Sequence, residues 1–425
     1  MSETMDVDLV IVGAGMVGLT AALALRDSGL SIMLLESRPA QSQSLLQQVQ
    51  EAAGQGFDAR VSALTCASEQ ILRSVDAWPV MQSLRLSPYT HMDVWDGEGT
   101  GRTHFSAADL HEPYLGHIVE NRVILAGLRT TLAEQPHIRL LEGVEVQALS
   151  EPRTAAAGFW RELSLSDGQR VRSRLVVAAD GALSRTRQLA ALPTWEWDYG
   201  HHAIVTTVRT ERSNGATAWQ RFTDDGPLAF LPLRDDADDH LSSIVWSTSP
   251  EHVRELMGLE DAAFCKALER AFEGRLGAVE WADQRHSFPL RQRHAKRYVQ
   301  EAFAAIGDAA HTIHPLAGQG VNLGLLDAAV LAEVVEAAAA RGDDIGAPRI
   351  LRRYQRRRQG ENLQMAAGME GFKRLFESQQ PLLVLGRNFG MQCFDRLGAV
   401  KNHLALVAMG LSGELPARAR RPCGD

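Results

Sequence analysis

Residues 8–36 read DLVIVGAGMVGLTAALALRDSGLSIMLLE, and the rest of the chain can be read outward from this stretch. Residues 9–12 are a short apolar run that suits one buried strand, and residues 19–26 are rich in Ala and Leu and suit a helix. A second apolar run, residues 31–35, closes on the acidic residue Glu36. The stretch therefore predicts a βαβ unit.

The turn between this strand and this helix has the G-x-G-x-x-G pattern of units that bind dinucleotides. Gly13 permits the tight turn, Gly15 lets the backbone approach a pyrophosphate, and Gly18 lets the helix pack closely on the strand. The helix N-terminus offers free N–H groups to the phosphates. Glu36 lies where a carboxylate can accept hydrogen bonds from ribose hydroxyls. The alternative is a glycine-rich turn without a ligand, and the unit alone leaves NAD and FAD open.

The composition limits the class of protein. A chain of 425 residues suggests two or three domains, or one large α/β fold with an inserted domain. Its four cysteines lack disulfide-framework or metal spacing, which favours a reducing, cytoplasmic setting and no metal site. The sequence contains neither a signal peptide nor an apolar run long enough to span a bilayer.

The net charge of −8 is unevenly distributed along the chain. From Arg349 onward, 14 Lys and Arg stand against 6 Asp and Glu, so this part carries +8 and the rest carries −16. The acidic bulk argues against nucleic-acid binding. The basic end, with six arginines between Arg349 and Arg358 and apolar stretches at residues 381–385 and 404–411, suggests contact with anionic lipid or a partner. Ordinary ion pairs with the acidic part of the chain are the alternative.

The middle of the chain differs in character from its two flanks. Residues 41–56 are rich in Gln without a clear period and are expected to form a loop. Strand-like runs at residues 203–208, 228–233 and 242–247 are separated by charged turns and predict an antiparallel sheet inserted into the nucleotide-binding fold. Residues 322–340 are expected to form a long helix.

Two further motifs follow apolar strands. The first is Asp180-Gly181, continuing as ALSRTR, and an Asp-Gly pair at a strand end is also a common turn. The second is Gly307-Asp308-Ala-Ala-His311, continuing as HPLAGQGVNLGLLD over residues 314–327. Asp308 can bind a ribityl hydroxyl. The glycine-lined turn and helix start that follow present N–H groups able to stabilise negative charge on a reduced flavin.

These three motifs, in this order, resemble those of the aromatic-ring flavoprotein monooxygenases with the para-hydroxybenzoate hydroxylase fold. HPLAGQGVNLGLLD looks like the signature of the ubiquinone-biosynthesis hydroxylases. DARVSAL, GHIVEN, the W-x-Y-x-HHA run, AFLPL, SIVWS and LRRYQRRR resemble the 2-polyprenylphenol hydroxylase branch. The resemblance covers nearly the whole chain, and its main departure is the long Gln-rich segment.

The resemblance implies an α/β, Rossmann-like FAD-binding fold of the para-hydroxybenzoate hydroxylase and glutathione-reductase type. It carries an inserted antiparallel-sheet substrate domain and a C-terminal helical region. The expected FAD-binding domain comprises residues 1–90, 105–190 and 290–345, the substrate domain comprises 91–104 and 191–289, and the basic helical region comprises 346–425.

The implied activity is hydroxylation of the ring of a prenylated phenol in ubiquinone synthesis. Non-covalent FAD, NAD(P)H and O2 would act through a flavin C4a-hydroperoxide. The first ring hydroxylation is the leading reading. A sister hydroxylase at another ring position, the same chemistry on another aromatic or apolar compound, and a flavin reductase are the alternatives. An oligomer, a complex with other ubiquinone-biosynthesis proteins and peripheral membrane contact are left open.

The resemblance also implies residue roles. Residues of the first motif and Glu36 hold the ADP half of FAD. Arg60 approaches the pyrophosphate and flavin, Arg122 contacts the phosphate or ribityl region, and for both arginines a surface salt bridge is the alternative. Asp180 and Gly181 serve FAD and NAD(P)H, while Asp308 binds the ribityl chain. The residues expected to line the pyrimidine edge of the flavin ring are Gly318, Gly320 and Asn322.

Catalytic side chains are harder to assign, because the flavin carries the difficult step. His311 and His314 are candidates for proton handling beside the flavin turn, although a structural role in that turn is favoured. The Pro315 carbonyl is a candidate contact to the substrate ring. Phe230, Leu231, Pro232 and Trp246 lie on strands expected to cover the flavin, but any sheet that faces a helical layer also needs apolar residues.

Overall fold

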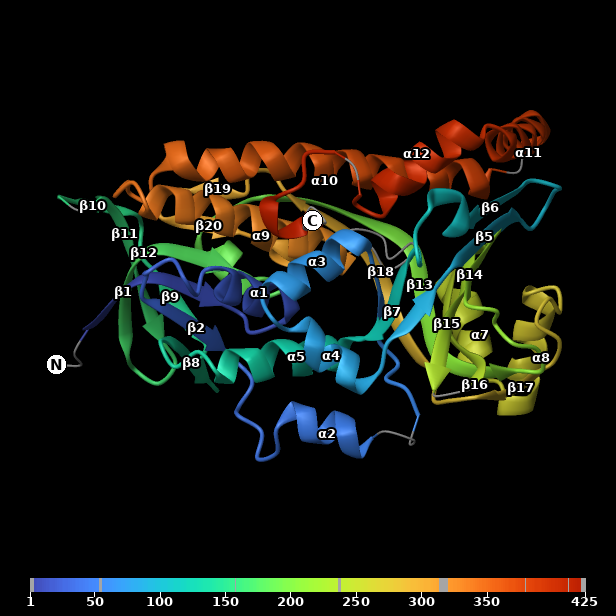
Figure 1. Cartoon of the computed structure of the whole chain (residues 1–425), viewed down its shortest axis with the longest axis horizontal. Coiled ribbons are helices and arrows are strands. Elements are labelled where there is room, and N and C mark those ends of the chain that lie inside the picture. Colours follow the sequence, from blue (N-terminus) through green and yellow to red (C-terminus); the bar gives the residue numbers. More distant parts are fainter. Residues whose placement is uncertain are drawn as a thin grey trace.

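The N-terminal βαβ unit forms as predicted in the computed structural model, which describes residues 4–52, 56–156, 158–235, 238–312, 320–378, 380–411 and 413–421 (Figure 1). The unit consists of β1 (Thr4–Val12), α1 (Met16–Ala24) and β2 (Ile32–Glu36). The strands are parallel, with Leu9 opposite Ile32 and Val12 opposite Leu35. Residues 9–12 are all buried, as expected for a parallel strand that is covered on both faces.

This unit lies at the centre of the first sheet. Its further strands are β8 (Ile138–Glu142), β9 (Val146–Leu149), β10 (Arg153–Ala155), β11 (Gly158–Leu165), β12 (Arg170–Ala178), β19 (Val299–Gln300) and β20 (Phe303–Ala305). The strand order is β10-β11-β12-β1-β2-β8, with β20 also paired to β12 and β9 to β11. Strands β8, β2, β1, β12 and β20 run parallel. Helix α1 packs between α5 (Asn121–Ala133) and α9 (Gly320–Ala339).

The second sheet is largely antiparallel. Its strands are β5 (His91–Asp96), β6 (Arg102–Ser106), β13 (Thr194–Thr210), β14 (Thr217–Thr223), β15 (Gly226–Asp235), β16 (Asp238–Thr248), β17 (Val279–Ala282), β18 (His286–Ala295) and β21 (His311–Thr312). The order is β21-β18-β13-β16-β15-β14-β5-β6. The three predicted strand runs are confirmed, and each is longer than its apolar core. One face is covered by α7 (Pro250–Gly258) and α8 (Asp261–Ala271).

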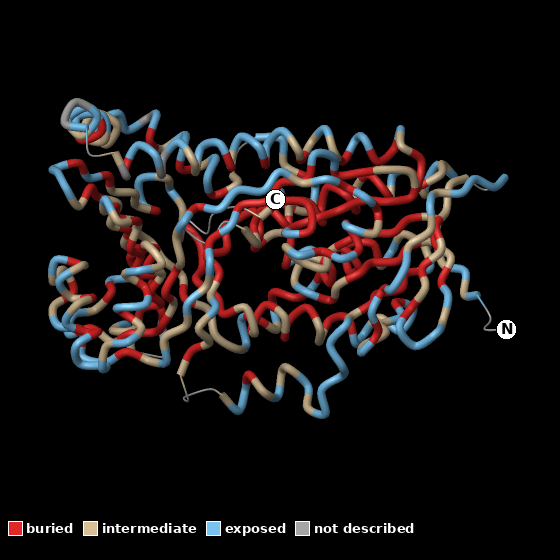
Figure 2. The backbone as a smooth tube through the Cα atoms, turned by 180° about the vertical axis from the view of Figure 1, so that it is seen from behind, coloured by how far each residue is buried: buried red, intermediate tan, exposed pale blue. Residues whose placement is uncertain are grey.

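The two sheets are linked by short elements and by strand pairing. A three-stranded sheet of β3 (Val61–Leu64), β7 (Gly116–Glu120) and β4 (Ser87–Tyr89) packs against β15, and α3 (Cys66–Ser74) and α4 (Trp78–Leu84) accompany it. Strand β21 follows the Asp308 turn directly and pairs with β18, so that His311 lies opposite His294. Figure 2 shows buried backbone running through both sheets. We propose that these sheets correspond to the FAD-binding and substrate domains expected above.

The Gln-rich segment is not simply a loop. Residues 45–51 form α2 (Leu45–Glu51), so the prediction of a loop over residues 41–56 is wrong for this part. The reason is a capping box: the Gln47 N–H donates to the Ser44 hydroxyl at 3.2 Å, and the Ser44 N–H donates to the Gln47 side chain at 3.3 Å. The S-x-x-Q spacing was present in the sequence and outweighs the absence of an apolar period.

The C-terminal region is helical, as predicted. It contains α10 (Pro348–Glu377), α11 (Pro381–Arg396) and α12 (Gly398–Ala408), which form one layer along an edge of the molecule (Figure 1). Helix α10 packs on α9. Among the described helices, none has the length and apolar character needed to cross a bilayer.

The basic arginines of α10 do not share one role. Arg358 is buried and bound to Asp327, and Arg357 pairs with Glu333 at 3.2 Å. Because Arg358 is buried, the hypothesis that it docks on an anionic surface is wrong. Arg357 forms an ion pair within the chain, which agrees with the alternative interpretation. Arg352, Arg353 and Arg356 are exposed, and no carboxylate among the described residues pairs with them.

Candidate active site

The predicted motifs converge at the carboxyl ends of four parallel strands. The strands lie in the order β2, β1, β12 and β20, and their last residues are in register: Val12 pairs with Leu35 and Ala178, and Ala178 pairs with Ala305. Each strand ends on a motif residue or is followed by one within three residues. In an open parallel sheet, ligands bind at this edge. The residues brought together there are Gly13, Glu36, Asp180 and Asp308.

The glycine turn has the geometry that a bound pyrophosphate requires. Gly13 has φ +107°, and a Cβ there would lie 2.5 Å from the Ala179 carbonyl oxygen. A Cβ on Gly18 would lie 1.9 Å from the Gly13 carbonyl oxygen, so helix and turn touch at this point. A Cβ on Gly15 would meet no protein atom within 4 Å. The chain therefore packs against two glycines and leaves open space at the third, where a phosphate can approach the backbone.

Glu36 is held beside this turn by two backbone hydrogen bonds. The Ala14 N–H donates to Oε2 at 2.9 Å and the Arg38 N–H donates to Oε1 at 3.0 Å. A carboxylate has about four acceptor positions. Each Glu36 oxygen thus keeps an acceptor position for a ribose hydroxyl, and the side chain is already oriented.

Asp180 is engaged by its own turn. Its carboxylate accepts from the Ser184 hydroxyl and from the Thr186 N–H at 3.0 Å, at the start of α6 (Arg185–Leu189). Gly181 has φ +84° in this turn. Arg187 is buried and donates to the Ala309 carbonyl at 2.8 Å, which ties this motif to the Asp308 turn. Any contribution of Asp180 to cofactor binding must therefore act through the shape of the turn or through a remaining lone pair.

Asp308 follows β20 by three residues, and no described residue is hydrogen-bonded to its side chain. Its side chain is exposed, yet enough protein surrounds it that loss of hydration raises the pKa of its carboxyl, while His311 and Arg60 act in the opposite sense. Arg60 is exposed, with its guanidinium 4.7 Å from the Phe288 ring centroid. Arg60 is close enough to Asp308 for its charge to lower the pKa of that carboxyl, and its contact with FAD stays a prediction.

Arg122 lies in a different set of contacts. Its guanidinium donates to Glu120 Oε1 at 2.9 Å and to the Gly56 carbonyl at 3.2 Å. Arg85 binds the same two residues. The buried Glu120 therefore holds Arg122 in an ion pair, which was the stated alternative, and an FAD contact by Arg122 stays a prediction.

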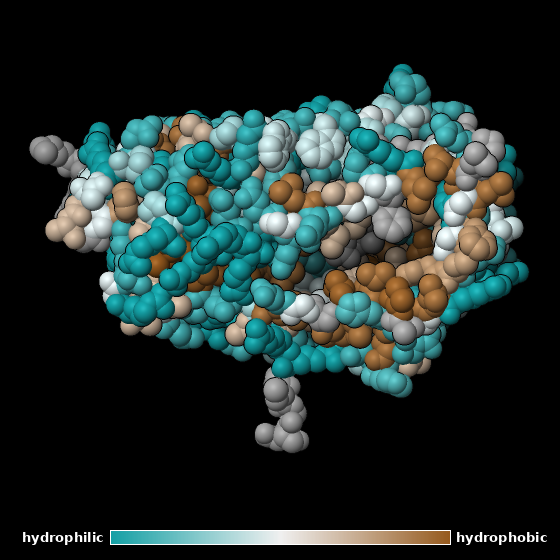
Figure 3. Space-filling model, turned by 90° about the horizontal axis from the view of Figure 1, so that it is seen from above, coloured by the Kyte–Doolittle hydropathy of each residue, from teal (hydrophilic) through white to brown (hydrophobic). Residues whose placement is uncertain are grey.

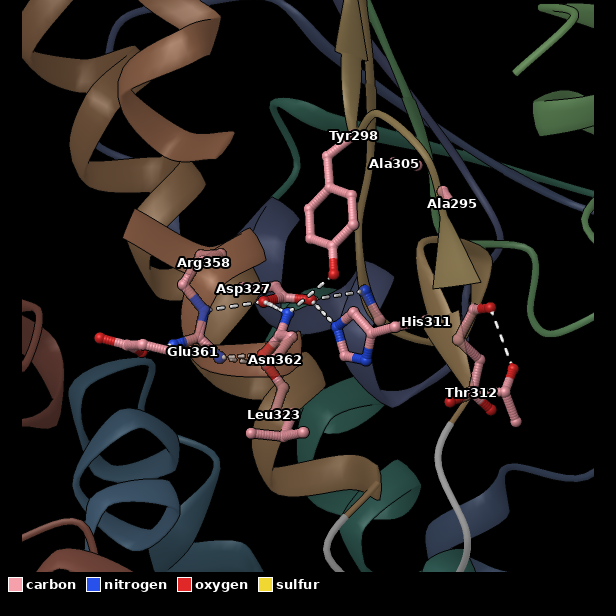
Figure 4. Close-up of polar contacts among 12 residues, drawn as sticks. Ala295, Tyr298, Ala305, His311, Thr312, Leu323, Asp327, Arg358, Glu361 and Asn362 are labelled. Carbon is pink, nitrogen blue, oxygen red and sulfur yellow. Dashed lines mark hydrogen bonds and ion pairs between the residues drawn. The ribbon is translucent and has the colours of Figure 1, made fainter. Parts of the chain in front are cut away.

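A buried polar network lies directly behind the Asp308 turn (Figure 4). Asp327, on α9, is fully buried and binds His311 Nε2 at 2.5 Å, Arg358 Nε at 2.8 Å and the Gly307 N–H at 3.0 Å. Burial alone would raise the pKa of Asp327, but His311 and Arg358 lower it to about 2. Asn362 also donates to Asp327, at 3.2 Å. The network fixes the strand end that carries Asp308 to α9 and α10.

This network favours one of the two interpretations of His311. Its ring is 1% exposed, and one nitrogen is taken up by Asp327. Such a group orients the turn rather than meeting solvent or substrate. The structural reading favoured from the sequence therefore agrees with the geometry.

The start of α9 is joined to the opposite side of the site. The Asn322 amide is buried, donates to the Ala63 carbonyl at 2.8 Å and accepts from the Thr65 N–H at 3.1 Å. Its side chain thus faces β3 and α3, and the predicted contact of Asn322 at the pyrimidine edge stays a prediction. Gly320 begins α9. His314, Pro315 and Gly318 lie outside the described residues, and their roles stay predictions.

Two of the four residues expected to cover the flavin face the other way. Phe230 stacks on Phe272 at 3.8 Å between ring centroids, and Trp246 packs near Phe264, beneath α7 and α8. The prediction is wrong for these two side chains, and the alternative that the sheet needs apolar residues under its helices is confirmed. Because side chains alternate along a strand, Leu231 instead joins Ala63 and Ile118 on the opposite face. Pro232 lies two residues from Phe230 on the same strand.

Four residues support the site although no role in it was predicted for them: Glu120, Arg187, Asp327 and Arg358. All four lie inside runs that were singled out from the sequence. Their buried, supporting roles are hard to predict from the sequence, because a charged residue on a helix is normally solvent-exposed. Within the described part of the chain, no group of His, Cys, Asp or Glu is arranged to hold a metal ion.

Comparison with known proteins identifies the family. Residues 6–367 match the model of the FAD binding domain family. The chain belongs to this family. Together with the relatives described next, this match makes the chain an FAD-dependent monooxygenase, and the open space at Gly15 and the exposed carboxylate of Asp308 fit that cofactor.

Relatives match the chain over nearly its whole length. An Escherichia coli K12 protein named 3-demethoxyubiquinol 3-hydroxylase is 37% identical over 405 residues, covering 95% of this chain and 98% of its own. The ubiquinone biosynthesis monooxygenase COQ6 of Xenopus tropicalis is 35% identical, covering 94% and 93%. Ubiquinone hydroxylase UbiL of Rhodospirillum rubrum is 36% identical, covering 95% and 89%.

Solved structures support the fold. The p-nitrophenol 4-monooxygenase PnpA of Pseudomonas putida DLL-E4 has a TM-score of 0.73 at 18% identity, covering 97% of this chain and all of its own. Klebsiella pneumoniae HpxO complexed with FAD has a TM-score of 0.70 at 18% identity, covering 96% and 99%. The fold is therefore that of the para-hydroxybenzoate hydroxylase class, as predicted.

Proposed function

We propose that the chain hydroxylates the aromatic ring of a polyprenylated quinol in ubiquinone biosynthesis, using FAD, NAD(P)H and O2. The observation that carries this proposal is the 37% identity, across 95% of the chain, to a protein named 3-demethoxyubiquinol 3-hydroxylase. The names of the COQ6 and UbiL relatives support the same pathway.

The ring position is the finer part of the proposal. The sequence favours the first hydroxylation, that of a 2-polyprenylphenol. The name of the Escherichia coli relative supports a sister reaction on a demethoxyubiquinol ring instead. We therefore propose a demethoxyubiquinol-type substrate and treat the first hydroxylation as an outcome of the test.

The protein's part in this reaction is binding and orientation. When bound, FAD would supply the redox chemistry, taking electrons from NAD(P)H and activating O2 for transfer to an electron-rich ring. Gly13, Gly15 and Gly18 with Glu36 hold the ADP half, and Asp308 accepts a hydrogen bond from the ribityl chain. The N–H groups at the start of α9 face the pyrimidine edge, where they stabilise negative charge.

His311 acts as a positioning residue in this proposal. Its bond to Asp327, together with the bond from the Gly307 N–H to the same carboxylate, holds the Asp308 turn in place. No nucleophile or metal is required from the chain, which must orient the ring and exclude water.

The test is made in cells and with the purified protein. Cells that lack the protein should accumulate a demethoxyubiquinol-type intermediate, and the purified protein should oxidise NAD(P)H faster when this compound is added and release the hydroxylated ring. Accumulation of a 2-polyprenylphenol instead would assign the first hydroxylation. Substrate-stimulated NAD(P)H oxidation without a hydroxylated product would make the protein a flavin reductase.

A further inference from the structure

The solvent-exposed faces of helices α11 and α12 are apolar, the reverse of an ordinary surface helix. In an ordinary surface helix the apolar residues face the core and the charged residues face water. Here the exposed positions are occupied almost entirely by apolar residues and glycine, and among the described ones only Arg396 and His403 are polar. The large exposed apolar side chains include Leu385, Phe389, Leu397, Val400, Leu404 and Val407.

Two charged residues of these helices, Arg387 and Lys401, are buried and point inward. Arg387 is buried and binds both oxygens of Asp96 on β5, with Nε 2.6 Å from Oδ2 and a terminal nitrogen 3.0 Å from Oδ1. Lys401 donates to the His104 carbonyl on β6 at 2.8 Å. Asn388 adds a hydrogen bond to Asp96 at 2.9 Å. Polar contacts thus fasten both helices to the β5–β6 hairpin, and their apolar sides are left outward.

The outward side of α10 continues this layer with positive charge. Arg352, Arg353 and Arg356 are exposed and lie on the side of α10 opposite its buried residues Leu351 and Tyr354. Figure 3 looks down on the layer of C-terminal helices: hydrophobic residues gather at the end where α11 and α12 lie, and hydrophilic residues cover the other end. Apolar and basic groups therefore share one side of the molecule.

We propose that this side docks on an anionic lipid bilayer, with the outer faces of α11 and α12 inserted at the interface. Helices that lie in a membrane surface combine an exposed apolar face with neighbouring basic residues, and each basic residue near an anionic leaflet adds to the attraction. A contact between two copies would be two-fold symmetric and would bring like-charged arginines toward one another. The inference concerns attachment alone and does not depend on which ring is hydroxylated.

The test uses co-sedimentation of the FAD-loaded full chain with phosphatidylcholine vesicles, with and without phosphatidylglycerol. Each inserted Leu or Phe side chain contributes roughly tenfold or more to partitioning. The double variant Leu385→Gln/Phe389→Gln should therefore bind about 100-fold more weakly. Trp281→Gln, which removes an exposed apolar side chain on β17 of the second sheet, away from α11 and α12, is the matched control and should bind like the parent.

The electrostatic part has its own variant. Arg353→Glu/Arg356→Glu should weaken binding to phosphatidylglycerol vesicles at low salt and leave the smaller binding to pure phosphatidylcholine unchanged. FAD content and melting temperature of each variant show that the fold is intact, because all four replaced side chains are exposed.

Three results would overturn the proposal. The parent protein fails to bind phosphatidylglycerol vesicles; the Leu385→Gln/Phe389→Gln variant binds as well as the parent; or the parent stays off vesicles but forms a dimer that this variant dissociates. The last result would assign the apolar face to a second copy of the chain. Hydroxylation of a short-chain, water-soluble quinol would be unaffected in each case, so the proposed function is tested separately.

Discussion

Replacing Arg358 by Leu removes a buried cation from the network behind the Asp308 turn. The side chains of Arg358 and Asp327 are 2% and 0% exposed, so water cannot substitute for the lost guanidinium. Removing one partner of such a pair typically costs about 3–5 kcal/mol. An unfolding entropy of about 2.1 cal/mol/K per residue gives about 0.9 kcal/mol/K for 425 residues. The melting temperature should therefore fall by about 3–6 °C.

The matched control is Arg356→Leu, two residues away on the same helix. Arg356 is exposed and should change the melting temperature by less than about 0.5 °C, since surface substitutions lie within about ±0.5 kcal/mol. Arg358→Lys keeps a positive charge but loses the forked guanidinium that donates to both Asp327 and Asn362. Its melting temperature should lie between those of Arg358→Leu and Arg356→Leu.

The assay is thermal unfolding followed by release of FAD fluorescence. Because Asp327 also holds the Gly307 N–H, Arg358→Leu should release FAD at a lower temperature than the parent. If Arg358→Leu melts within about 1 °C of the parent, the ion pair does not stabilise the fold as argued. If Arg356→Leu proves as harmful, the effect belongs to net charge and not to the buried pair.

Three further predictions concern the cofactor site and pH. Gly15→Ala should leave the stability of the FAD-free protein unchanged, because the φ of −78° at Gly15 suits Ala, but it should weaken FAD binding, because the added Cβ would contact only the ligand. Gly18→Ala should instead impair folding, because the added Cβ would clash with the Gly13 carbonyl. Equilibrium dialysis of FAD and urea unfolding separate the two effects. Asp308→Ala should weaken FAD binding by about 10- to 150-fold, the loss of one charge-assisted hydrogen bond of about 1.5–3 kcal/mol, and an unchanged affinity would remove Asp308 from the site. Burial lowers the pKa of His117 to about 4 from its ordinary value of 6.5. Between these two pH values the unfolded chain therefore binds a proton at His117 that the folded chain does not bind. Stability should be full above about pH 6.5 and fall toward pH 4 by up to about 3 kcal/mol, and urea unfolding of His117→Gln should show a weaker pH dependence.

The sequence predicts the part of the site that depends on local geometry. The turn from Gly13 to Gly18 and the acidic residues at strand ends follow from short-range patterns, and the parallel register then places them together. Helix α2 could have been predicted as well, because its capping residues Ser44 and Gln47 are adjacent in sequence.

Burial that results from packing between elements far apart in the sequence could not be predicted from the same patterns. Arg358 stands among arginines that look alike in sequence, and only the packing of α10 on α9 makes it a core residue. Phe230 and Leu231 are adjacent apolar residues, and nothing local says which of the two faces the helices. The outward apolar side of α11 likewise becomes visible only once Arg387 is seen to turn inward.

The pairing of β21 with β18 limits how this enzyme can be recombined with its relatives. Two residues that directly follow the nucleotide-binding turn serve as an edge strand of the other sheet, so His311 belongs to both halves at once. If residues 194–295 were exchanged for those of a relative, the foreign β18 would have to pair with the native β21, whose His311 binds the native Asp327. Chimeras with altered substrate preference should therefore carry β21 and α9 from the same parent as β18.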